Sequence, residues 1–306
     1  MFISCHQGAS TVTALDDEFE LIARVKTPSQ PHVCAFDTKR ELIYATITYR
    51  DGWYNEHGDH GEEIVVVDPA TWTITRVVDI SPYAGPHDLS VQGDELHVVC
   101  ESHGGCLLTL NLDTFEPAGH IPIGVPGPHW LAATSAKAYT GNKERAFVSV
   151  LDLVERRPLK RIPTRTGSED LELNADGSIL YAADRDEPLL FVIDTETDTE
   201  IRAVTLPGNP HNVHALDDGL VVVSHFRQWD YDRPQDGSIS VTDPESGQIV
   251  AREIPVGAAP LGIASDADHV YVNAGTTMSV VDRKTWQVET VVDVDAGAHE
   301  LILLGR

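Results

Sequence analysis

Short apolar segments separated by polar turns recur along the whole chain of 306 residues. Each unit of about 40 residues contains four such segments, rich in β-branched residues, and no stretch keeps the 3.6-residue period of an amphipathic helix. The third segment ends in Asp or Asn before a polar turn and is the clearest marker of the unit. It recurs at residues 11–16, 64–68, 107–111, 147–152, 191–194, 239–243 and 278–282, with the first copy degenerate.

Seven copies of a four-stranded unit predict an all-β fold, a seven-bladed β-propeller in which each blade buries its faces against its neighbours. We expect residues 1–306 to form a single domain of this kind. Residues 299–304 match only the first strand of a unit, whereas the N-terminal residues match the second to fourth strands. The last blade is therefore expected to be closed by strands from both ends of the chain.

Short motifs within the repeats resemble those of the YVTN-type seven-bladed β-propeller repeat proteins. Residues 139–142 (YTGN) and 271–273 (YVN) stand at the end of the second strand, and residues 257–264 (GAAPLGIA) match the entry to the first strand. The resemblance covers essentially the whole chain and implies the propeller architecture. Because propellers carry enzymes, binders and scaffolds alike, the resemblance alone implies no particular reaction.

Aligning the first strands exposes one column that is rich in histidine. Since the first strand is the innermost of a blade, this position should face one mouth of the central channel in every repeat. The column reads His32, His87, His129, Glu169, His211, Leu261 and His299. Imidazole nitrogens suit Fe, Cu or Zn, whereas Mg and Ca prefer oxygen. We therefore predict a transition-metal site in which the five histidines and Glu169 are the candidate ligands.

Two other interpretations of this column stay open. Pro-His can be no more than a favoured way to enter a strand, with each histidine capping local backbone. The ring can also bind an anion or a substrate without any metal.

The second strand of a blade ends on the face where the first begins, so its last residues should border the same mouth. The candidates for acid–base or carboxylate-binding roles there are His103, His225 and Arg185. Two insertions between strands carry aromatic residues that are typical of lids over a pocket. The predicted substrate pocket comprises Trp53, Tyr54, Glu101, Asn142, Trp229 and Tyr231.

The acidic composition narrows the expected partners. The chain has 22 Lys+Arg against 48 Asp+Glu, a net charge of −26, which repels nucleic acid and anionic membranes. No apolar run reaches the roughly 20 residues that cross a bilayer, and the N-terminal residues lack a secretory signal, so we expect a cytoplasmic protein. The four cysteines form no C-x-x-C pair and are expected to be free thiols.

Three hypotheses of function follow, and the sequence does not settle the oligomeric state under any of them. The first is a metalloenzyme that acts on a small organic molecule, with Fe or Cu redox chemistry slightly favoured because the ligands are neutral. The second is a metal-assisted lyase or hydrolase, in which lactonases are included. The third is a non-catalytic propeller that binds metal or docks a protein.

A weaker resemblance bears on the second hypothesis. In virginiamycin B lyase-like propellers the functional histidine also follows proline at the start of an inner strand, as in Pro86-His87 and Pro210-His211. That resemblance implies lyase chemistry. However, it also implies a metal held by carboxylates, whereas the ring here is mostly histidine.

Overall fold

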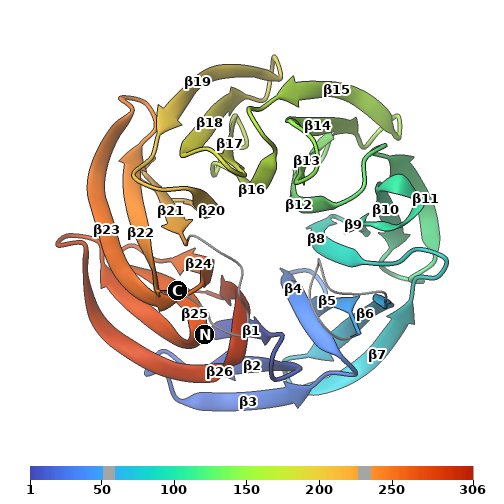
Figure 1. Cartoon of the computed structure of the whole chain (residues 1–306). Helices are drawn as coiled ribbons and strands as arrows, with labels where there is room; N and C mark the ends of the chain where they lie inside the picture. Colours follow the sequence, from blue (N-terminus) through green and yellow to red (C-terminus); the bar gives the residue numbers. More distant parts are fainter. Residues whose placement is uncertain (51–58, 227–235, 306) are drawn as a thin grey trace.

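The computed structural model describes residues 1–50, 59–226 and 236–305. Its antiparallel sheets stand radially around a central axis, so the fold is an all-β propeller (Figure 1). Five of the sheets have four strands each. In each of these sheets the strands follow the chain from the axis outward. The first sheet consists of β4 (Gln30–Asp37), β5 (Leu42–Tyr49), β6 (His60–Asp68) and β7 (Thr73–Asp79), and the second of β8 (Pro86–Gln92), β9 (Glu95–Cys100), β10 (Cys106–Asn111) and β11 (Pro117–Pro122). The third consists of β12 (Pro128–Ala133), β13 (Lys137–Asn142), β14 (Phe147–Asp152) and β15 (Arg157–Pro163), the fourth of β16 (Ser168–Leu173), β17 (Ile179–Asp184), β18 (Leu189–Asp194) and β19 (Thr199–Thr205), and the fifth of β20 (Pro210–Ala215), β21 (Val221–His225), β22 (Asp236–Asp243) and β23 (Gln248–Ala258).

The sixth sheet is larger and corrects the predicted number of blades. It has six strands, in the order β24 (Pro260–Ser265), β25 (His269–Asp282), β26 (Gln287–Leu303), β1 (Phe2–His6), β2 (Thr11–Leu15) and β3 (Leu21–Lys26). The described residues therefore form six blades rather than seven. The last two predicted repeats share one sheet because β25 and β26 each run on through both. Ala298 pairs with Gly275 on one side and with His6 on the other, which joins the two halves.

The two ends of the chain pair as expected. Phe2 lies opposite Leu303, and Ser4 lies opposite Leu301, in antiparallel register between β1 and β26. Phe2 and Leu301 are both buried. The ring is therefore closed by backbone pairing between the first and the last strand.

The repeat marker has a simple structural cause. Oδ1 of Asn111 accepts the backbone N–H groups of Asp113 and Thr114, each at 3.0 Å. Asp152 and Asp282 make the same kind of turn after β14 and β25. A short side-chain acceptor thus replaces backbone pairing where the chain reverses, which explains why Asp or Asn ends this strand in most units.

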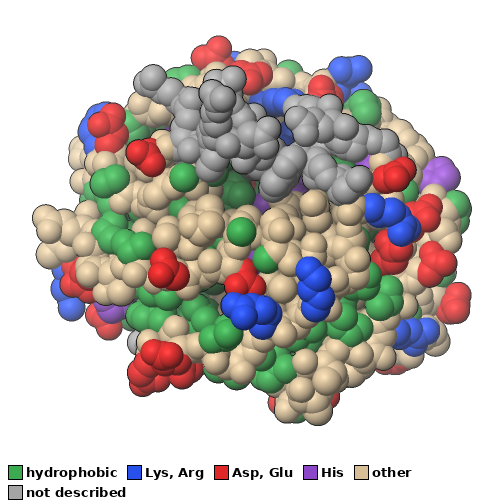
Figure 2. Space-filling model, turned by 60° about the horizontal axis from the view of Figure 1, so that its bottom comes forward, with side chains coloured by type: hydrophobic (Ala, Val, Ile, Leu, Met, Phe, Trp, Pro, Cys, Tyr) green, Lys and Arg blue, Asp and Glu red, His purple; other side chains and the backbone are tan. Residues whose placement is uncertain are grey.

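Apolar side chains from adjacent sheets form the core between the blades. Ile64 and Val66 of β6 belong to one buried cluster with Val98 of β9 and Leu108 of β10. On the face that Figure 2 shows, acidic and basic side chains are interspersed over the surface. In the described part of the chain, the single helical element is η1 (Ser102–Gly104), and no helix is long and apolar enough to cross a membrane.

Candidate functional site

A β-bulge at the start of the inner strands brings two successive side chains toward the axis. In β8, Pro86 lies opposite Cys100 and Leu89 lies opposite Val98, so three steps on β8 face two on β9. Such an extra residue interrupts the strict alternation of faces. The same shift occurs at residues 31–34, 128–131, 168–171, 210–213, 260–263 and 298–301. The axis is consequently lined by two layers, the predicted histidine column and the residue that follows each of its members.

Four imidazoles of the first layer form a continuous contact chain. The ring centroids of His299 and His32 are 3.9 Å apart, those of His32 and His87 are 4.0 Å apart, and those of His87 and His129 are 3.7 Å apart. Each of the four side chains is buried. We call this group, together with Glu169 and His211, the imidazole ring.

Glu169, one of the remaining ring members, contacts both His211 and a lysine that the sequence analysis did not identify. Nζ of Lys143 lies 2.9 Å from Oε1 of Glu169, and Nε2 of His211 lies 3.2 Å from the same oxygen. Nδ1 of His129 lies 3.0 Å from the backbone carbonyl of Glu169 and donates to it. Lys143 directly follows β13, so its position at the end of a second strand was the signal that pointed to it.

Burial keeps the imidazoles neutral. It lowers the pKa of His211 to about 4 and of His299 to about 3, and it holds the pKa values of His32, His87 and His129 well below the usual 6.5. The positive charge of Lys143 acts in the same direction on all five. Neutral imidazole is the form that binds metal ions.

Glu169 and Lys143 form a buried ion pair. Burial by itself would raise the pKa of Glu169, but the charge and the hydrogen bond of Lys143, together with the charge of Arg185, outweigh it, and the pKa lies below its usual value. Burial lowers the pKa of Lys143, and the carboxylate of Glu169 opposes that shift. The imidazole ring therefore contains one carboxylate among neutral nitrogen donors, and the ammonium of Lys143 lies beside that carboxylate.

The donor chemistry of the ring fits a transition metal, but the side-chain rotamers do not converge on one point. Nδ1 of His32, His87 and His299 are buried without a hydrogen-bond partner in the described structure. Among the described residues, three donor atoms lie within 4.8 Å of one another at the surface group His269, Asp282 and Glu289, and not in the ring. An ion held by three ring ligands therefore requires the packed imidazoles to rotate about their side-chain bonds.

Two of the predicted catalytic residues do not reach the ring. The nitrogens of His225 are both engaged, Nδ1 at 3.1 Å from the carbonyl of Asn209 and Nε2 at 2.7 Å from Oγ of Ser240. His103 is exposed in η1 and packs on Tyr83. The end of a second strand thus serves local hydrogen bonding in one case and solvent contact in the other.

The third, Arg185, lies beside the ring. Its Nη1 donates to the carbonyl of Lys143 at 2.8 Å and lies 3.0 Å from Oε1 of Glu144. Its charge also helps to lower the pKa of Glu169. Arg185 therefore positions the Lys143 segment, and its binding of a substrate carboxylate stays a prediction.

The predicted pocket residues are only partly described. Glu101 accepts a hydrogen bond from the Tyr49 hydroxyl at 2.7 Å, and the centroid of the Tyr49 ring is 6.5 Å from that of His32. Glu101 is therefore connected to the imidazole ring through Tyr49. Asn142 donates to the carbonyl of Phe147 at 2.8 Å and stabilises the turn after β13. Trp53, Tyr54, Trp229 and Tyr231 lie outside the described residues.

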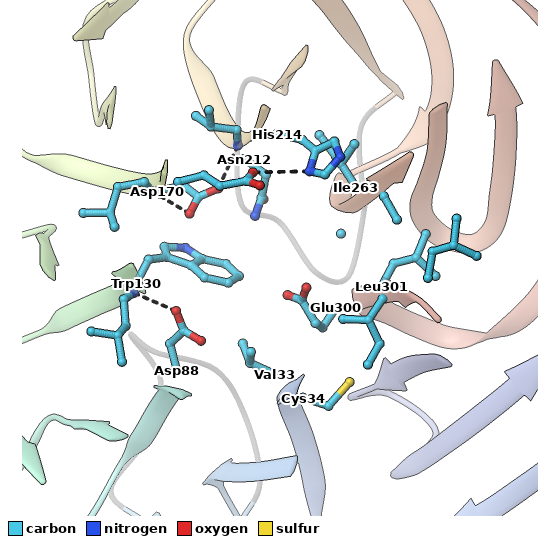
Figure 3. Close-up of a pocket in the computed structure, with 18 of the residues that line it drawn as sticks. Val33, Cys34, Asp88, Trp130, Asp170, Asn212, His214, Ile263, Glu300 and Leu301 are labelled. Atoms are coloured by element: carbon cyan, nitrogen blue, oxygen red, sulfur yellow. Dashed lines mark hydrogen bonds and ion pairs between the residues drawn. The ribbon is translucent and has the colours of Figure 1, made fainter. Parts of the chain in front are cut away.

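The second layer lines a cavity of about 390 Å³ (Figure 3). Asp88 accepts the N–H groups of Leu89 and Leu131, each at 2.6 Å. Two blades further along the chain, Asp170 accepts the equivalent N–H groups of Leu171 and Val213. Burial raises the pKa of Asp88 to about 7 and of Glu300 to about 8, and it raises that of Asp170 well above its usual value. The sequence analysis missed this layer, although the acidic residue after His87, Glu169 and His299 was a visible signal.

Trp130 belongs to the second layer and contacts the imidazole ring. Its indole lies 6.0 Å from the His299 ring in a stacked arrangement and meets the His129 ring edge-on at 5.5 Å. It also lines the cavity of the second layer. Figure 3 shows the indole projecting into the centre of that cavity.

No family model and no curated protein matches the chain. Solved structures do match. Hydrazine synthase from Kuenenia stuttgartiensis aligns with a TM-score of 0.59 at 19% identity, over 67% of this chain and 65% of that one. Dihydro-heme d1 dehydrogenase NirN in complex with DHE aligns with a TM-score of 0.64 at 17% identity, over 95% of this chain and 63% of that one. The chain shares their propeller fold. It spans a little under two thirds of each of these proteins, and identities this low establish the fold alone.

Proposed function

We propose that the chain is a metal-dependent enzyme that binds Fe, Cu or Zn through the imidazole ring and acts on a small organic molecule at that mouth of the channel. One observation carries the proposal, the contact chain of four buried imidazoles. Burying an imidazole whose Nδ1 has no partner costs free energy. A metal ion that accepts these nitrogens as ligands would recover that free energy.

The residues divide the work in this proposal. His32, His87, His129 and His299 would hold the ion, which when bound supplies redox or Lewis-acid chemistry. Lys143 neutralises Glu169 and offers a positive charge to a substrate that carries a carboxylate or a similar anionic group. Trp130 closes the floor of the site and contacts the imidazoles from the second layer.

Redox chemistry remains our preference over lyase or hydrolase chemistry, since the donor set is mostly neutral nitrogen. The similar propellers bear the names of a synthase and a dehydrogenase, which is consistent with an enzymatic role for such a fold. The weak resemblance to virginiamycin B lyase-like propellers keeps the second chemistry as the alternative.

The test is elemental analysis of protein purified from cells supplied with Fe, Cu and Zn. We expect one of these metals at a near-stoichiometric level and its loss in His87→Ala. The matched control is His97→Ala, because His97 is equally buried but bonds to Thr109 within its own sheet. Full metal content in a folded His87→Ala variant would refute the proposed ligand role.

A second candidate, an anion-binding ring without metal, is favoured by the buried ammonium of Lys143, whose charge opposes a bound cation. In that case chelator-treated protein should bind acetate, and Lys143→Met should abolish this binding. Metal content below stoichiometry together with Lys143-dependent acetate binding would select this candidate over the first.

A further inference from the structure

The cavity that the indole of Trp130 enters has its own chemistry, distinct from that of the imidazole ring. We call it the acidic chamber and define it by Asp88, Trp130, Asp170, Asn212 and Glu300, all of which line the cavity of about 390 Å³. It extends along the inner strands away from the histidine layer, as far as Ser265 and Leu303. A volume of this size accommodates a small organic molecule.

The acidic chamber gathers carboxyl groups and no basic counter-charge. Among the described residues that line it there is no Lys or Arg, and its one histidine, His214, lies 3.3 Å from Glu172. Asp88 is close enough to act electrostatically on both Asp170 and Glu300. Figure 3 shows the carboxyl groups of Asp88 and Glu300 facing the same space beside the indole of Trp130. Carboxylates buried together are unfavourable unless they take up protons or a cation accompanies them, so a bound cation would favour their charged form.

The indole of Trp130 is a second, independent feature of the acidic chamber. Trp130 is 6% exposed, and its Nε1 is buried without a hydrogen-bond partner in the described structure. The ring projects into the cavity between the carboxyl groups (Figure 3). An indole face attracts a cation, and its N–H can donate to an acceptor on the same ligand.

The spacing of the oxygens distinguishes an organic cation from a bare metal ion. No three carboxylate or histidine donor atoms of the chamber lie within 4.8 Å of one another in the described part of the chain. A single divalent ion would therefore lack a chelating set. A larger ligand can reach the separated carboxyl groups while its apolar part packs on the indole.

We propose that the acidic chamber binds a small organic ammonium or guanidinium ion, which places its positive group between Asp88 and Glu300 and its apolar part against Trp130. Asp88 and Asp170 each already accept two backbone N–H groups, so they are held in place before the ligand arrives. The remaining lone pairs of these oxygens are free to accept from the ligand. The inference does not depend on metal in the imidazole ring.

Isothermal titration calorimetry with benzylammonium chloride tests the proposal on the chain of 306 residues in EDTA. We expect one site per chain, and benzyl alcohol, the neutral analogue, should bind at least about 10-fold more weakly. Glu300→Gln should weaken benzylammonium binding about 10-fold or more, and Trp130→Leu several-fold. Glu289→Gln is the matched control, because it removes the same charge from an exposed position and should leave the affinity unchanged.

If the unmodified protein bound benzylammonium and benzyl alcohol with equal affinity, the proposal would be overturned. It would also be overturned if millimolar benzylammonium gave no heat of binding. An unchanged affinity in a folded Glu300→Gln variant would overturn it too. The His87→Ala variant should keep its benzylammonium site. Retention there, combined with loss of metal, would separate this inference from the proposed function, and either can fail alone.

Discussion

Replacing Lys143 with Met removes the ammonium that lies 2.9 Å from Oε1 of Glu169 and keeps most of the length of the side chain. The side chains of the pair are 8% and 6% exposed, so the carboxylate left behind stays out of water. Breaking a buried pair by removing one partner costs about 3–5 kcal/mol. His211 remains 3.2 Å from Glu169 and offsets part of this cost. We therefore expect the free energy of unfolding to fall by about 3 kcal/mol.

The pair can be separated from its surroundings by a double-mutant cycle. Glu169→Gln alone should also destabilise the protein, because it leaves a buried ammonium. Lys143→Met combined with Glu169→Gln removes both charges, and exchanging a buried pair for neutral side chains is often close to neutral. The double variant should consequently be more stable than the sum of the single effects predicts, with a coupling energy of roughly 2 kcal/mol or more.

Urea unfolding in the presence of EDTA measures these differences without a contribution from bound metal. The control is Lys39→Met, since Lys39 lies 2.6 Å from Asp94 but the two side chains are 63% and 53% exposed. A pair as exposed as this contributes about 1 kcal/mol or less. If Lys143→Met and Lys39→Met had equal effects, or if the two ring substitutions were additive, the reasoning from burial would be refuted.

Two further predictions concern the acidic layer and the closure of the ring. Because burial raises the pKa of Asp88 to about 7 and of Glu300 to about 8, against usual values of 3.8 and 4.5, the folded state retains protons that the unfolded state releases. Their contribution to the free energy of unfolding is complete below pH 3.8 and is lost as the pH rises through about 8. Glu300→Gln should therefore reduce the fall in the free energy of unfolding across that pH range, measured in the presence of a chelator. An unchanged pH profile would contradict this. Deleting residues 298–306 removes the partner of β1 and the buried Leu301, and the melting temperature should drop by about 10 °C or more by differential scanning fluorimetry. Unchanged melting would show that this pairing does not close the ring.

The sequence predicted a site residue correctly only where the position of that residue in the repeat decides whether it reaches the axis. The positions of His32, His87, His129 and His299 follow from the repeat, since equivalent residues of a radial fold reach the same axis. The roles of His225 and His103 do not follow from it. Proximity to the mouth along a strand leaves the direction of the side chain undetermined, and local partners such as Ser240 decide it.

Because each repeat pairs its own strands, the repeat pattern in the sequence alone determined the four-stranded units, the Asp and Asn turns and the column of histidines. The incomplete repeats at the two ends of the chain likewise predicted that these ends pair. The number of separate blades required the structure, because the continuity of β25 and β26 depends on how Ala298 pairs on both sides. The same is true of the second layer and of Lys143. A bulge turns Asp88 and Glu300 inward, and the ammonium of Lys143 meets a carboxylate from the next blade, as a result of register and packing between distant segments.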